Sequence, residues 1–138
     1  ETGTVQCGGF AFAVAASTTG TAVKFPIASL KGSAGAKPIG FVERTFTAPI
    51  ELGTDTPDIY PKGSELTIAV RGDYYIVAPA AATLGQAVLC DPTTGAITFG
   101  DAGAANDTGW TVQTAGAKGD TIIISNHGLG YQPAASGS

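Results

Sequence analysis

The residues of this chain that could carry chemistry are few. His127 is the only histidine, and the two cysteines, Cys7 and Cys90, lie far apart in the sequence. A Ser–His–Asp triad would have to use His127, yet the sequence has no Gly-x-Ser-x-Gly turn to expose a serine. One histidine and two distant cysteines do not match the ligand spacing of a zinc site. We therefore expect His127 to be an ordinary solvated side chain, and we predict no catalytic and no metal-binding residues.

The carboxylates offer one further candidate site. Glu51, Asp55 and Asp58 lie close together in the sequence and could supply oxygen ligands to calcium. The segment Asp-Thr-Pro-Asp at 55–58 does not match a calcium loop, so we favour a solvated loop. The glycine-rich segments also lack the Gly-x-x-x-x-Gly-Lys-Ser/Thr pattern of a phosphate cradle. We predict that the protein binds no cofactor and is not an enzyme.

The tripeptide Arg71-Gly72-Asp73 has two interpretations. Some integrin-binding proteins use this tripeptide for adhesion. Glycine and aspartate are also common turn residues, and an alternating segment, Glu65–Arg71, comes directly before them. A second alternating segment, Tyr74–Pro79, follows. We therefore predict that Gly72 and Asp73 close an antiparallel hairpin between these two segments.

The charge and the length of the apolar runs exclude two classes of partner. The net charge is −4, and the seven Lys and Arg residues are scattered instead of forming the basic stripe that phosphate contacts require. No apolar run approaches the roughly 20 residues of a membrane span. We therefore expect neither nucleic acid nor membrane as a partner.

Two cysteines permit at most one disulfide, and we favour two free, largely buried thiols. Because the sequence contains no methionine, we expect translation to begin elsewhere than at Glu1.

A second hairpin is predicted from turn chemistry. Gln86–Cys90 and Ala96–Phe99 are short apolar segments separated by Asp91-Pro92-Thr93-Thr94-Gly95. Pro92 presets its own φ for a type I turn, and Gly95 can adopt the left-handed conformation that restores pairing. These features predict an antiparallel pair across this turn.

Short apolar segments punctuated by turn residues continue along the chain and predict an all-β fold. No window shows the apolar spacing of an amphipathic helix. We expect a compact antiparallel β-sandwich or small β-barrel of about eight short strands, with long loops and extended termini. Residues 1–127 are predicted to form a single β domain with residues 1–4 as an extended arm, and 128–138 a flexible or partner-docked tail. The remaining strands are expected within Val5–Ala15, Ala22–Ile27, Ile39–Thr45, Trp110–Thr114 and Thr121–Ser125.

Residues 45–64 form the longest stretch without a clear strand pattern. Loops longer than about 12–15 residues in compact domains are usually functional or disordered, and disordered loops are seldom rich in apolar residues. The apolar side chains here either cap the protein's own core or lie in a protein–protein interface, and we favour the interface. The candidate interface residues are Phe46, Ile50, Leu52, Ile59 and Tyr60.

The order of features from about Gly40 to Asn126 resembles the structural cement, or decoration, proteins of tailed bacteriophages. The resemblance spans close to two-thirds of the chain, and several short motifs occur in the family's order. These motifs are Ile39-Gly40-Phe41-Val42, Tyr60-Pro61-Lys62-Gly63, Arg71-Gly72-Asp73-Tyr74-Tyr75, Leu84-Gly85-Gln86-Ala87-Val88, Thr94-Gly95-Ala96-Ile97-Thr98 and Ile122-Ile123-Ile124.

The resemblance implies a non-enzymatic protein that binds the outer surface of a phage head. Such a protein would bridge major capsid protein subunits and so stabilise the shell, in the virion, after assembly in the host bacterial cytoplasm. We also expect a homo-oligomer, with a trimer favoured over a dimer. The alternative is a β-sandwich receptor-binding or adhesin module, from a tail fibre or a secreted protein, that uses Arg71-Gly72-Asp73.

Overall fold

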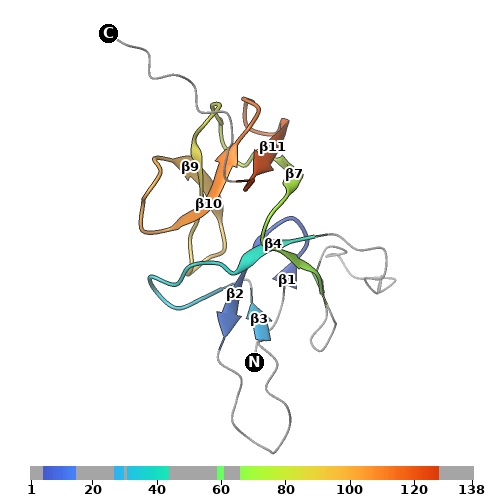
Figure 1. The fold of residues 1–138 in the computed structure, drawn as a ribbon, viewed down its shortest axis with the longest axis vertical. Coiled ribbons are helices and arrows are strands. Elements are labelled where there is room, and N and C mark those ends of the chain that lie inside the picture. The colour runs from blue at the N-terminus through green and yellow to red at the C-terminus, as the bar shows by residue number, and fades with distance from the viewer. Residues whose placement is uncertain (1–4, 15–26, 30, 44–58, 61–65, 128–138) are drawn as a thin grey trace, which may run out of the picture. The chain divides into compact units, whose positions relative to one another are not determined.

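A computed structural model describes residues 5–14, 27–29, 31–43, 59–60 and 66–127 (Figure 1). These residues contain eleven β-strands and no helix. Eight of the strands have three or more residues, since only β1, β5 and β6 are two residues long. Every strand pairing among the described residues is antiparallel. The prediction of an antiparallel all-β fold is confirmed.

The chain divides into two compact units. Unit 1 comprises residues 1–69 together with Pro92–Gly95, and unit 2 comprises Val70–Asp91 and the chain from Ala96 onward. Each unit has its own sheet, and neither sheet closes on itself in the described residues, so the barrel is excluded as the architecture. The prediction that residues 1–127 form a single domain remains a prediction.

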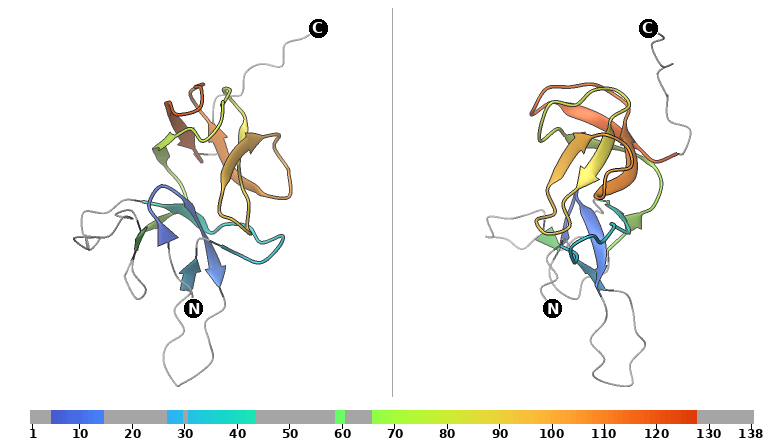
Figure 2. Two further views of the ribbon diagram at one scale, coloured as in Figure 1. Left: turned by 180° about the vertical axis from the view of Figure 1, so that it is seen from behind. Right: turned by 90° about the vertical axis from the view of Figure 1, so that its left-hand side faces the viewer.

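Unit 1 contains a four-stranded sheet and a separate two-stranded pair (Figure 2). The sheet has the order β3-β2-β4-β6, and its strands are β2 (Phe10–Val14), β3 (Ile27–Ser29), β4 (Gly40–Val42) and β6 (Ile68–Ala69). The pair consists of β1 (Val5–Gln6) and β5 (Ile59–Tyr60). Cys7, Gly8 and Gly9 join β1 to β2, and Gly8 has a φ of 76°, which explains the glycine at this turn.

Alternation along β2 buries side chains on both faces of the unit 1 sheet. Ala11 belongs to a core cluster with Val5, Val42 and Tyr60. Phe10, next to Ala11 and therefore on the opposite face, stacks edge-on against Phe41 of β4 with ring centroids 5.5 Å apart. A strand this apolar on both faces is typical of one covered on both sides.

Unit 2 contains a five-stranded sheet with the order β7-β11-β10-β8-β9. The strands are β7 (Asp73–Val77), β8 (Ala87–Cys90), β9 (Ile97–Gly100), β10 (Asp107–Val112) and β11 (Thr121–Ser125). One face forms the core of the unit, where the largest buried side chain is Trp110, beside Tyr74 at 5.9 Å between ring centroids. The other buried members of this face include Ile76, Val88, Cys90, Val112, Ile122 and Ile124.

The predicted hairpin between Gln86–Cys90 and Ala96–Phe99 is confirmed. β8 and β9 pair in antiparallel register, with Val88 opposite Phe99 and Cys90 opposite Ile97. The Asp91 N–H donates to the Ala96 carbonyl over 2.9 Å, and Gly95 has a φ of 77°, in the left-handed region.

The predicted hairpin between Glu65–Arg71 and Tyr74–Pro79 is wrong. β6 pairs with β4 in unit 1, and β7 pairs with β11 in unit 2. Between them Gly72 has a φ of 150°, where side chains are strained, and the chain leaves unit 1 instead of folding back on it. Alternation in sequence identified the two strands but not their partners, because each strand binds a segment distant in the sequence.

Candidate interaction surface

Most of the predicted interface residues lie outside the described part of the chain. This is so for Phe46, Ile50 and Leu52. The backbone of Ile59 pairs with Gln6 in the β1–β5 ladder. The side chain of Ile59 is not among those that the structure describes. The interface prediction for these four residues remains a prediction.

Tyr60 occupies the core of unit 1. Its side chain is 2% exposed and packs with Val5, Ala11 and Val42. The phenolic hydroxyl donates to the Glu43 carbonyl over 3.2 Å. The side chain of Tyr60 thus packs in the core of unit 1, which is one of the two alternatives that the sequence left open.

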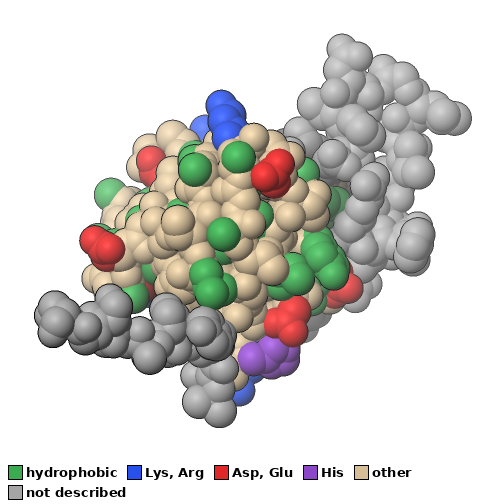
Figure 3. Space-filling view, turned by 90° about the horizontal axis from the view of Figure 1, so that it is seen from above, with side chains coloured by type: hydrophobic (Ala, Val, Ile, Leu, Met, Phe, Trp, Pro, Cys, Tyr) green, Lys and Arg blue, Asp and Glu red, His purple; other side chains and the backbone are tan. Residues whose placement is uncertain are grey.

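An exposed apolar strip lies instead on the edge of the unit 2 sheet. Tyr75 and Val77 of β7 are 74% and 67% exposed, and both lie on the face opposite the core. Tyr75 is opposite Ile123 of β11, which is half-buried, and Val77 is opposite Thr121. Figure 3 shows hydrophobic side chains scattered over the face that it draws, between uncharged surface and separate Asp and Glu side chains. Sequence alternation placed Tyr75 and Val77 on one face but gave no sign that this face is open.

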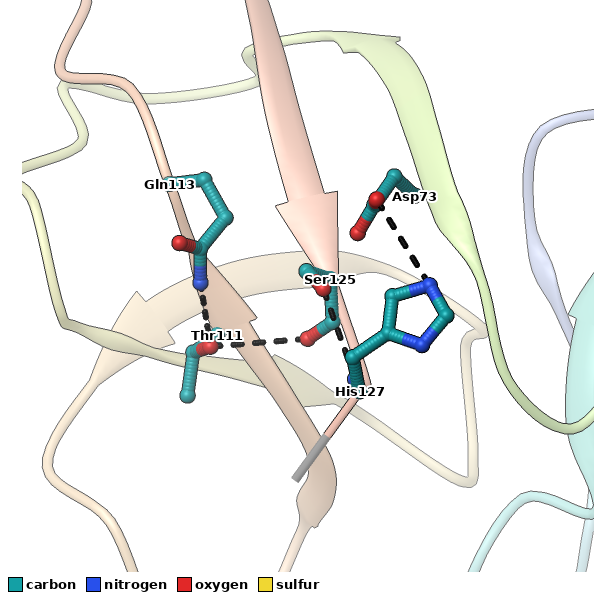
Figure 4. Close-up of polar contacts among 5 residues, drawn as sticks. All are labelled: Asp73, Thr111, Gln113, Ser125 and His127. Carbon is teal, nitrogen blue, oxygen red and sulfur yellow. Dashed lines mark hydrogen bonds and ion pairs between the residues drawn. The ribbon is translucent and has the colours of Figure 1, made fainter. Parts of the chain in front are cut away.

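A polar cluster lies on the same face, built by β7, β10 and β11 (Figure 4). The Gln113 amide donates to Thr111 Oγ1 over 2.9 Å, and Thr111 Oγ1 donates to the Ser125 carbonyl over 3.4 Å. His127 Nε2 lies 3.6 Å from Asp73 Oδ2, with both side chains exposed. These contacts tie the ends of the three strands together.

The cluster contains a serine, a histidine and an aspartate, but its geometry differs from a catalytic triad. Ser125 is buried, and its Oγ accepts the backbone N–H of His127 over 3.4 Å. The imidazole itself faces Asp73. A triad requires the imidazole to take the serine proton, and no such contact is present between these residues.

The Arg71-Gly72-Asp73 segment is fixed by Asn126. Asn126 N–H donates to the Gly72 carbonyl over 3.1 Å, and Asn126 Nδ2 donates to the Val70 carbonyl over 2.9 Å. A Cβ at Gly72 would also lie 2.7 Å from the Tyr74 ring. The φ of 150° and the close approach of the Tyr74 ring therefore account for the glycine, although Arg71 and Asp73 are both exposed.

The two cysteines lie in different units and are not joined by a disulfide. Cys90 is buried, and this desolvation, with a smaller contribution from the Asp91 carboxylate, raises its pKa from the ordinary 9.0 to about 11. Within the described ranges no three His, Cys, Asp or Glu residues gather as metal ligands, and the calcium candidates Glu51, Asp55 and Asp58 lie outside those ranges. The described part of the chain also holds no helix that qualifies as a membrane span.

Comparison with known protein families identifies the chain. The family described as "Structural cement protein (E217 gp24/Pam3 gp6)" matches residues 1–126. The match begins at residue 1, whereas the resemblance seen in the sequence began at about Gly40. No curated protein matches the chain. Because the match covers far more than half of the sequence, the chain belongs to the structural cement protein family of bacteriophages.

Proposed function

We propose that this protein binds the outer surface of a phage head and stabilises the shell by bridging major capsid protein subunits. The observation that carries the proposal is the family match over residues 1–126. The exposed side chains of Tyr75 and Val77, on one face of β7, add apolar surface that a protein partner could bury.

In this proposal the candidate loop 45–64 contacts the capsid through Phe46, Ile50, Leu52 and Ile59. Burying each large apolar side chain contributes roughly 1.5–3 kcal/mol before ordering costs. A bridging protein that contacts two subunits gains further from effective concentration, so two weak contacts produce tight binding. Neither nucleic acid nor membrane takes part. The protein acts as a homo-oligomer on the virion, with assembly in the host cytoplasm.

The test is addition of the purified chain to heads that lack it. We expect saturable binding, with a copy number proportional to the major capsid protein by mass spectrometry of the particles. Decorated heads should release DNA at a higher temperature than bare heads, because cross-bridges oppose the outward pressure. Failure to bind bare heads would refute the proposal. Binding to host cells that is lost in Arg71→Ala would favour the receptor-binding alternative instead.

A further inference from the structure

One edge of β7 has no strand partner among the described residues. β7 is the first strand of the unit 2 sheet, and β11 is its only partner among the described residues. The Ala78 N–H donates to the Asp120 carbonyl, and the Asn126 N–H donates to the Gly72 carbonyl, just beyond either end of β7. Hydrogen-bonding direction alternates along a strand, so even-numbered residues face β11. The N–H and C=O groups of Asp73, Tyr75 and Val77 therefore point away from the sheet.

The same residues also carry the exposed side chains. Tyr75 and Val77 are 74% and 67% exposed, and Asp73 is exposed as well. Pro79 follows, and a proline cannot donate to a ladder, so the available edge ends there. An exposed apolar edge strand with unused backbone groups is a template for pairing with another strand.

We propose that β7 pairs antiparallel with β7 of a second copy about a two-fold axis. The register places Tyr75 opposite the partner's Tyr75, and Asp73 opposite the partner's Val77. Each of these pairs brings outward-facing backbone groups together, so each exchanges two hydrogen bonds. The register sets no like charges opposite one another, and it places the exposed Tyr75 side chains of the two copies side by side on one face of the joined sheet.

The other edge of the sheet is a poorer partner. β9 has no large hydrophobic side chain as exposed as Tyr75 or Val77, because Ile97 and Phe99 are half-buried. A head-to-tail pairing of β7 with β9 would leave much of the β7 strip facing polar surface, and repeated pairing would lead to a ring such as a trimer. The β7–β7 contact is symmetric and stops at two copies. It forms in solution, independently of binding to a head.

Cysteine trapping tests the contact directly. In a hydrogen-bonded antiparallel pair the Cα atoms lie about 5.5 Å apart, within the range of a disulfide. Tyr75→Cys, in the full chain with Cys7→Ala, should form a covalent dimer under copper–phenanthroline oxidation. Thr98→Cys on β9 is the matched control and should stay monomeric on a reducing-agent-free gel. Cross-linking of Tyr75→Cys to Thr98→Cys in a mixture would overturn the proposal in favour of the head-to-tail ring.

Charge substitution at Val77 tests the register. Val77→Asp places a carboxylate opposite the partner's Asp73, whereas Val77→Lys places a cation there. Analytical ultracentrifugation should show at least a tenfold rise in the dimer dissociation constant for Val77→Asp and a value near the unsubstituted one for Val77→Lys. Circular dichroism checks that both variants keep the β fold. Equal weakening by both substitutions, or a chain that is monomeric at all concentrations and gives no Tyr75→Cys dimer, overturns the proposal.

Discussion

Cys7 and Cys90 carry the same functional group in two different environments. Cys7 is half-buried beside the unit 1 cluster, and Cys90 is fully buried in the β8 strand of unit 2. A thiolate is costly to form without water, which is why the Cys90 pKa rises to about 11. Because the thiolate is the reactive species, the two thiols should differ sharply in reactivity.

Thiol labelling separates the two cysteines. With an aromatic disulfide reagent at pH 8, we expect Cys7 to react quickly and Cys90 to react only after denaturant is added. Cys7→Ala should remove the fast phase and leave the slow one. Two fast phases of equal rate in the folded protein would show that Cys90 is accessible, contrary to its burial.

The Cys90 pKa also predicts a pH dependence of stability. The folded-state value of about 11 lies above the ordinary 9.0, so the folded protein holds this proton more tightly than the unfolded chain does. The contribution is complete below pH 9 and is lost as pH rises through 11. Relative to Cys90→Ala, the unsubstituted protein should therefore lose free energy of unfolding between these values. Urea titrations at pH 8, 9, 10 and 11 measure the free energy of unfolding of both proteins. A difference between the two proteins that stays constant from pH 8 to pH 11 would contradict the raised pKa of Cys90.

Gly40 is required by close packing between two strands. A Cβ there would lie 2.5 Å from the Ala69 carbonyl oxygen, which belongs to the backbone of β6. A Cβ at Gly100 would meet only the end of the Leu89 side chain, at 2.8 Å, which can move. Gly40→Ala should lower the free energy of unfolding by about 1–3 kcal/mol, and Gly100→Ala by less. Chemical denaturation with fluorescence detection measures the free energy of unfolding of both variants. An equal loss in the two variants would argue against the close contact between β4 and β6.

At the scale of elements, the sequence predicted local pairing well and distant pairing poorly. The β8–β9 hairpin was predictable because Pro92 and Gly95 determine its turn within the same short segment. The partner of β7 was not predictable, because β11 lies more than forty residues further along the chain and no turn residue links them. The exposed strip at Tyr75 and Val77 was missed for the same reason. Which face of a strand is covered depends on the elements that pack against it.

The loop 45–64 is the element on which the capsid proposal makes its sharpest prediction. Replacing Ile50 and Leu52 together with serine should lower particle occupancy at least tenfold, because two apolar anchors are lost from every contact. The thermal midpoint of the free protein should stay nearly unchanged. Occupancy is measured by mass spectrometry of heads after sedimentation.

Leu84→Ser provides the control for this loop. Leu84 is a partly exposed leucine in unit 2, so the substitution removes an apolar side chain elsewhere and should leave occupancy unchanged. Unfolding of the double variant would place the loop in the core instead. An intact fold with full occupancy would show that the capsid contact lies on another surface.

The charge of the whole molecule is low and its sign is unfavourable for electrostatic attraction to other acidic proteins. Charged residues make up 13% of the sequence, and the net charge is −4. The exposed strip that the structure shows is apolar, and the candidate loop carries five large apolar side chains beside Glu51, Asp55, Asp58 and Lys62. Long-range electrostatic steering should therefore contribute little to assembly, and burial of apolar surface should contribute most.

This balance predicts that binding to heads depends weakly on salt. The Debye length falls from roughly 10 Å at 0.1 M to about 3 Å at 1 M ionic strength, so exposed ion pairs lose most of their attraction over this range while apolar contacts keep theirs. Occupancy of bare heads, titrated with the purified protein at both sodium chloride concentrations, should give half-saturation points within about threefold of each other. The heads must first be shown by electron microscopy to stay intact at both concentrations. A half-saturation point that rises tenfold or more in high salt would contradict an apolar interface, and it would direct the search to the scattered cations Lys31, Lys37, Arg71 and Lys118.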